Sequence, residues 1–130
     1  MEKLVDIETA LTIFEQAAVE HALATEQGDY KLANQSYSAI TKSITFLKEQ
    51  DVLTRLVKLL DHQSIGVRMW AAASLLPIKE ADAITALEKI SKEQGIHSLT
   101  AEMTLNEWKE GGSSILDRFN MNGIKSKRRF

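Results

Sequence analysis

The fold is decided by the stretch Leu53-Thr-Arg-Leu-Val-Lys-Leu-Leu-Asp-His-Gln-Ser-Ile-Gly-Val-Arg-Met-Trp-Ala-Ala-Ala-Ser-Leu-Leu76. Its leucines at 53, 56, 59 and 60 recur at helical spacing, and Val67, Ala71 and Leu75 restart that spacing after a polar segment. The segment from Asp61 to Gly66 carries the turn residues. The stretch therefore predicts two helices joined by a tight turn, with small alanines where they cross. Such hairpins build α-solenoids, which mostly bind other macromolecules.

Length and composition indicate one soluble domain. The chain has 130 residues, of which 44% are hydrophobic and 26% charged, and it has no cysteine. Disulfides, a thiolate nucleophile and a cysteine-ligated zinc are therefore excluded. The first residues are acidic where a signal peptide would be basic, and no apolar run approaches the ~18 residues of a membrane span. We expect a cytoplasmic protein with no membrane association.

The net charge of −2 conceals an uneven distribution. Residues 125–130 carry a charge of +4 and no acid, whereas residues 1–52 hold nine acids and four bases. An acidic body favours basic partners and makes nucleic acid an unlikely one. The basic tail could touch RNA, phosphate or an acidic surface, but such an end is more often simply solvated.

The periodicity predicts an all-α fold with no strand. The expected helices are at about 4–25, 30–49, 53–61, 67–76, 80–94 and 99–110, followed by a short helix and a basic tail in 113–130. Gly28-Asp29, Pro77, Gly95 and the pair Gly111-Gly112 separate them. The six main helices form three antiparallel pairs within one domain, residues 1–112. Three pairs are about the minimum for a stable stacked array.

The central stretch resembles the HEAT-repeat signature. The matching residues are Leu53, Leu56, Leu59, Leu60 and Asp61, then Val67, Arg68, Ala71 and Ala72. The usual turn prolines are absent, with Gln63 and Ile65 in their places. With the segments 83–90 and 99–105, the chain is similar to a small family of bacterial HEAT-like domains over most of residues 1–110. The resemblance implies a short α-α superhelix without established catalytic residues, and some relatives look like toxin-immunity proteins.

The candidate binding surface is the acidic first helix. Glu8 and Glu15 are seven residues apart and share a side of this helix, with Glu26 close to the same line. An acidic face can steer the approach of a cationic target and raise specificity. Met69 and Ala73 are expected to be exposed beside Trp70. If the acidic face does not bind the partner, the predicted interface is around these two residues and on the exposed side of the 99–110 helix.

Four residues have structural interpretations that compete with binding ones. Asp61 and Arg68 flank the central turn and are predicted to pair across it, although Arg68 could instead face a partner. Trp70 and Trp108 are predicted to pack in the core, although tryptophan is also a frequent interface anchor.

No residue pattern indicates catalysis, a metal or a cofactor. None of the three histidines, His21, His62 and His97, has a second ligand at helical spacing on an intact helix. Glu93 has the right spacing from His97, but Gly95 lies between them. We interpret the three histidines as scattered surface or turn side chains. We expect a non-catalytic protein-binding module, most concretely an immunity-type inhibitor that occludes a basic intracellular toxin. The alternatives are a HEAT-like nucleic-acid-binding or lesion-processing protein, and a scaffold or chaperone subunit with clustered exposed apolar residues.

Overall fold

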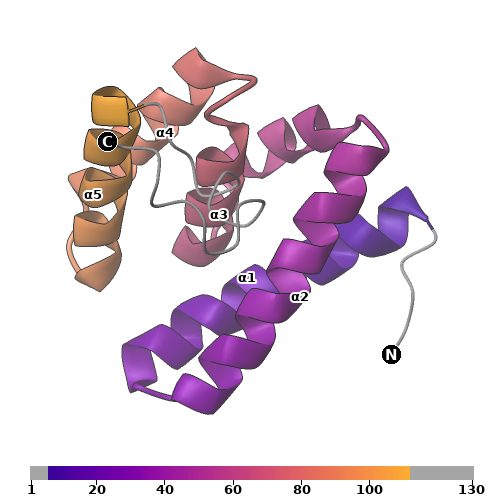
Figure 1. The fold of residues 1–130 in the computed structure, drawn as a ribbon. Coiled ribbons are helices and arrows are strands. Elements are labelled where there is room, and N and C mark those ends of the chain that lie inside the picture. The colour runs from indigo at the N-terminus through magenta and orange to yellow at the C-terminus, as the bar shows by residue number, and fades with distance from the viewer. Residues whose placement is uncertain (1–5, 112–130) are drawn as a thin grey trace.

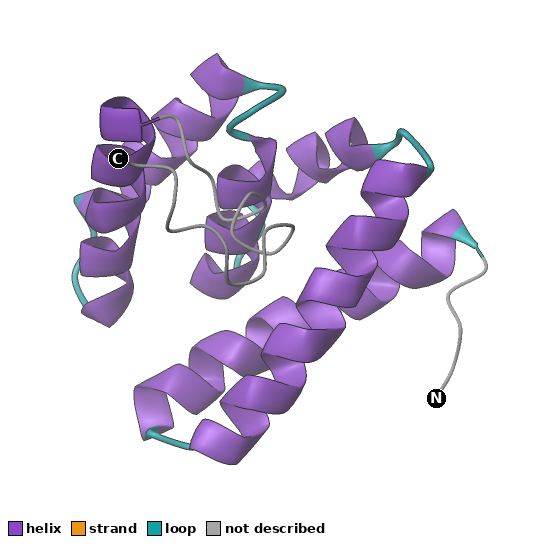
Figure 2. Cartoon of the chain, viewed as in Figure 1, coloured by secondary structure: helices purple, strands orange, loops and turns teal. Residues whose placement is uncertain are grey.

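The computed structural model describes residues 6–111 of the chain, and every regular element within that range is helical (Figures 1 and 2). The elements are α1 (Ile7–Gln27), α2 (Tyr30–Glu49), the 3₁₀ helix η1 (Leu53–Asp61), α3 (Ile65–Leu75), α4 (Glu80–Ser91) and α5 (Ile96–Gly111). The predicted all-α class is confirmed, since these residues contain no strand. The expected short helix and basic tail, residues 113–130, lie outside the described residues.

The first two helices form a long hairpin (Figure 1). Local side chains set the ends of both helices. The carboxylate of Asp6 caps α1 by accepting the Thr9 N–H at 2.8 Å. Gly28 ends α1 in the left-handed region, with a φ of 73°, which glycine adopts without strain. Asp29 then caps α2 by accepting the Leu32 N–H at 3.1 Å. The break predicted at Gly28-Asp29 is confirmed.

The central turn is shorter than predicted. The Ser64 hydroxyl caps α3 by accepting the Val67 N–H at 3.5 Å, so this helix begins at Ile65 rather than at Val67. Gly66 is therefore a buried helical residue and not a turn residue. A Cβ at Gly66 would lie 2.5 Å from the Ala18 carbonyl oxygen and 2.6 Å from the Ala22 Cβ. Glycine at this position allows α3 to approach the backbone of α1.

The end of α3 agrees with the prediction, whereas α4 and α5 differ from it at the glycine between them. Helix α3 ends at Leu75, two residues before Pro77, as the sequence indicated. Helix α4 ends at Ser91, before Gly95, and α5 begins directly after this glycine rather than at Leu99. The Gly95 φ of 114° is suited to glycine, and it allows the chain to reverse between α4 and α5.

Helix α3 is the centre of the packing. Helix α1 packs mainly against α2. Helix α4 lies between α5 and α3 and contacts both to a similar extent, and α3 contacts η1, α4, α1 and α5. Because helices surround α3, Met69 and Ala73 are only 7% and 2% exposed. The prediction that these two residues are exposed is therefore wrong. Among the described helices, none combines the length and hydrophobicity needed to cross a membrane.

Candidate functional site

Three polar bridges connect α1 to later parts of the chain. Arg55 donates to Glu8 at 2.7 Å, the His62 Nε2 lies 2.7 Å from the Glu15 carboxylate, and the His97 Nε2 lies 2.9 Å from that of Glu26. We call these six residues the polar seam. Glu8 and Glu15 are seven residues apart, as are Arg55 and His62, so the partners follow one another in the same order along both segments.

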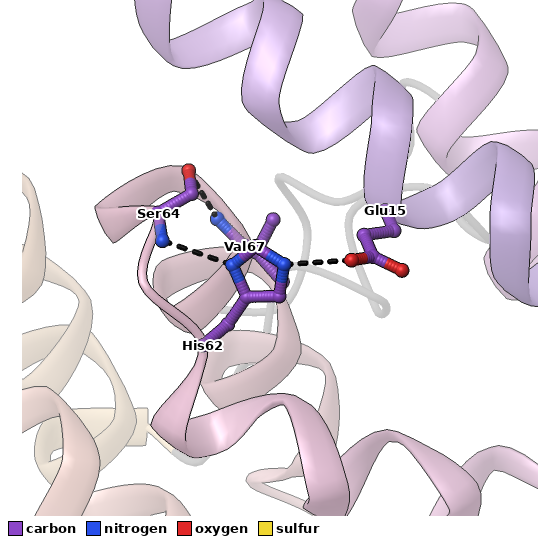
Figure 3. A network of polar contacts seen from close by, with 4 residues as sticks. All are labelled: Glu15, His62, Ser64 and Val67. Atoms are coloured by element: carbon purple, nitrogen blue, oxygen red, sulfur yellow. Dashed lines mark hydrogen bonds and ion pairs between the residues drawn. The ribbon is translucent and has the colours of Figure 1, made fainter.

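The middle bridge of the polar seam continues into the start of α3 (Figure 3). The His62 Nδ1 accepts the Ser64 N–H at 2.9 Å, and the Ser64 hydroxyl in turn caps α3. Since Nδ1 acts as an acceptor, these hydrogen bonds assign the ring proton to Nε2, which donates to Glu15. This network fixes the first turn of α3 relative to α1.

The polar seam changes the interpretation of the acidic face. Glu8, Glu15 and Glu26 lie along one side of α1, as predicted, but each carboxylate has a partner within the chain. Their side chains are 77%, 46% and 45% exposed, so each bridge contributes at most about 1 kcal/mol. That these residues bind a partner protein stays a prediction. Such a partner would have to compete with a bridge that is already formed.

The predicted turn pair between Asp61 and Arg68 is wrong. Arg68 donates to Glu93 at 2.8 Å, which connects α3 to the segment after α4, and Asp61 is exposed at the end of η1. The hydrogen bond from Arg68 holds the pKa of the Glu93 carboxyl below its usual value. The cause is the early start of α3, which places Arg68 in its second turn beside α4 instead of over the turn.

An aromatic trio joins the first hairpin to α3. The Trp70 ring makes edge contacts with the rings of His21 and Tyr37, with centroid distances of 5.6 and 5.8 Å. Trp70 is 7% exposed and belongs to the hydrophobic core, consistent with its structural interpretation. Burial lowers the pKa of His21, and the charge of His97 lowers it further. His21 is therefore not a scattered surface histidine.

The second tryptophan has a mixed environment. Trp108 is half-buried and packs against the core from α5. Its indole Nε1 donates to the Glu80 carboxylate at 2.7 Å, so it also ties α5 to the start of α4. A half-buried indole often satisfies its N–H in this way.

A row of exposed apolar side chains remains on α5. Ile96, Leu99 and Met103 are 50%, 59% and 54% exposed and lie three and four residues apart. From the sequence, the exposed side of this helix was predicted only as a secondary location for the interface. Its signal was the helical spacing of three apolar residues that do not share the side of Ala101 and Leu105.

The described residues offer few reactive arrangements. Within residues 6–111 no three histidine or acidic side chains come close enough to hold a metal ion. Hydroxyls such as those of Ser36, Ser43 and Ser74 donate to carbonyls in their own helices. The polar and aromatic contacts described above hold the helices together.

Comparison with protein-family models, with curated proteins and with solved structures gives no match to this chain.

Proposed function

We propose that the chain is a non-catalytic protein-binding module, a short HEAT-like stack of helix pairs that inhibits a basic protein inside the cell. The observation that carries this proposal is the acid excess of the described residues. Residues 6–111 contain 16 acidic and 10 basic side chains, and the ion pairs Arg55–Glu8 and Arg68–Glu93 leave this excess unchanged, because each pairs one acid with one base. The field of such a surface attracts cationic targets, of which a toxin with a basic active site is one kind.

The structure also supports a preformed binding surface. The polar seam links α1 to η1, to the start of α3 and to α5, and the aromatic trio links α1 and α2 to α3. A scaffold held together in this way loses little conformational entropy when a partner binds. Occlusion of a target's active site needs such a surface and no chemical step.

The nucleic-acid alternative has less support. Binding to a phosphate backbone requires a continuous basic face, because affinity derives from the release of counterions at several lysines or arginines. The acid excess of residues 6–111 opposes that, and their exposed lysines are distributed over α2, η1, α4 and α5.

Affinity capture tests the proposal. The full chain, immobilised at low salt, should retain a protein with an excess of lysine and arginine from an extract of its source cells. The retained protein, once purified, should bind the chain in calorimetry with an affinity that falls as ionic strength rises. An acidic partner, or a partner whose affinity is indifferent to salt, would remove the charge argument. Turnover of the partner by the chain would contradict the non-catalytic proposal.

A further inference from the structure

The outer face of α5, which we define as Ile96, Leu99 and Met103, is apolar and open. These side chains follow each other at positions i, i+3 and i+7 on one side of the helix, and each is at least half exposed. The opposite side of α5 buries Ala101 and Leu105 against the rest of the fold. Figure 1 shows α5 at one edge of the molecule, next to α4.

An apolar row is unusual on the outward side of a helix, which in globular proteins normally carries charged and polar residues. Single exposed apolar residues are normal, but a contiguous row marks an interaction surface. Leu23, 48% exposed, lies one turn before Glu26 on α1, and the Glu26–His97 bridge brings that end of α1 to the start of α5.

The charges around the outer face indicate the chemistry of its partner. Glu102, Glu107 and Glu110 are exposed on α5, against the single base Lys109. Glu110 lies seven residues after Met103, so it continues the line of the apolar row. A complementary ligand needs apolar side chains at helical spacing with lysine or arginine beside them.

We propose that the outer face of α5 docks an amphipathic basic helix of the partner protein. This inference rests on the proposed function and assigns its interface to α5. The apolar side of the ligand helix covers Ile96, Leu99 and Met103, and its lysines or arginines face the carboxylates of Glu102 and Glu110. Apolar burial then supplies most of the affinity, and the charges supply orientation and on-rate.

The probe is a synthetic helix of about 18 residues with leucine at i, i+3, i+4 and i+7 and lysine elsewhere. A second peptide keeps the leucine pattern and carries glutamate in place of lysine. Each is titrated into the ¹⁵N-labelled full chain, and amide shifts locate the binding site. The lysine peptide should shift the α5 amides around Leu99 and Met103, and the glutamate peptide should not.

Two variants, each replacing an exposed apolar residue with lysine, locate the contact. Leu99→Lys should weaken binding of the lysine peptide about tenfold or more, since burial of one leucine is worth that factor and the new charge repels the probe. Ile78→Lys is the matched control, because Ile78 is 48% exposed but lies between α3 and α4. It should leave binding within about twofold. Equal effects of both substitutions, shifts elsewhere in the chain, or tight binding of the glutamate peptide would each overturn the proposal.

Other occupants of the outer face give distinct results. If the chain's own residues cover it, Leu99→Lys lowers the midpoint of thermal unfolding by much more than the degree or two expected of a surface change. If a second copy covers it, light scattering shows a dimer that the same variant dissociates. Either result overturns the assignment of a partner helix. If the captured basic protein binds wild type and Leu99→Lys equally, the α5 assignment fails while the proposed function stands.

Discussion

Replacing Gly66 with alanine should destabilise the protein, although the same change stabilises most helices. In an unobstructed helix interior, Gly→Ala gains roughly 0.5–1 kcal/mol because alanine loses less backbone entropy, and this is the upper bound for Gly66, the second residue of α3. At Gly66 the added Cβ would lie 2.5 Å from the Ala18 carbonyl oxygen and 2.6 Å from the Ala22 Cβ. Comfortable separations are about 3.5–4 Å, so α1 and α3 must move apart by about 1 Å. Neither neighbour can rotate away, since one is backbone and the other is attached directly to it.

Overpacking of this kind costs typically 1–3 kcal/mol and exceeds the propensity gain. We therefore expect a net loss of about 1–2 kcal/mol in the free energy of unfolding, measured by urea denaturation. In a chain of this size that corresponds to a decrease of roughly 4–8 °C in the thermal midpoint. Gly111→Ala is the control, because Gly111 is also near a helix end, as the last residue of α5, and nothing lies within 4 Å of its Cβ position. If Gly66→Ala proved as stable as Gly111→Ala, the close crossing of α1 and α3 would be refuted.

Three further predictions concern the contacts of α1 and α3. Trp70→Ala should lower the free energy of unfolding by roughly 3–5 kcal/mol, because it empties a buried indole site; urea denaturation measures the loss. The lowered pKa of His21 means that the unfolded chain takes up its proton first as pH falls below about 6.5. The free energy of unfolding of the wild type, minus that of His21→Gln, should therefore be larger at pH 7 than at pH 5. The same difference at both pH values would exclude this effect. Glu15→Lys should lower stability by up to about 1 kcal/mol by breaking the bridge to His62, whereas Glu20→Lys, at an exposed position of the same helix, should change it less.

Local signals predicted the helices well. The break at Gly28-Asp29 and the end of α3 before Pro77 depend on the backbone preferences of one or two residues, and both were found where the sequence placed them. The start of α3 was misplaced because Gly66 resembles a turn residue. Its actual role depends on Ala18 and Ala22, more than 40 residues away in the chain. The 3₁₀ geometry of η1 likewise has no signature in its leucine spacing, which fits either helix type.

The candidate site was harder to predict because charge patterns do not distinguish solvent from an internal partner. The sequence placed Glu8, Glu15 and Glu26 correctly on one side of α1, but Arg55, His62 and His97 become their neighbours only through tertiary packing. A weak signal existed in the equal spacing of Glu8 with Glu15 and Arg55 with His62. The predicted exposure of Met69 and Ala73 was wrong because a helix that lines an open face would expose them, whereas other helices surround α3.

The polar seam and the outer face of α5 are structurally connected. His97 belongs to the first turn of α5 and is bridged to Glu26, while Ile96 beside it begins the apolar row. The Ser98 N–H and hydroxyl both donate to the Gly95 carbonyl oxygen and close that first turn, and the bridge to α1 adds a tertiary contact at the start of the row. The histidine side chain is only 12% exposed, which makes this contact less accessible to water than the Glu8–Arg55 bridge at the other end. In the proposed docking mode, Glu26 therefore contributes without touching the partner, by joining the end of α1 to the first turn of α5.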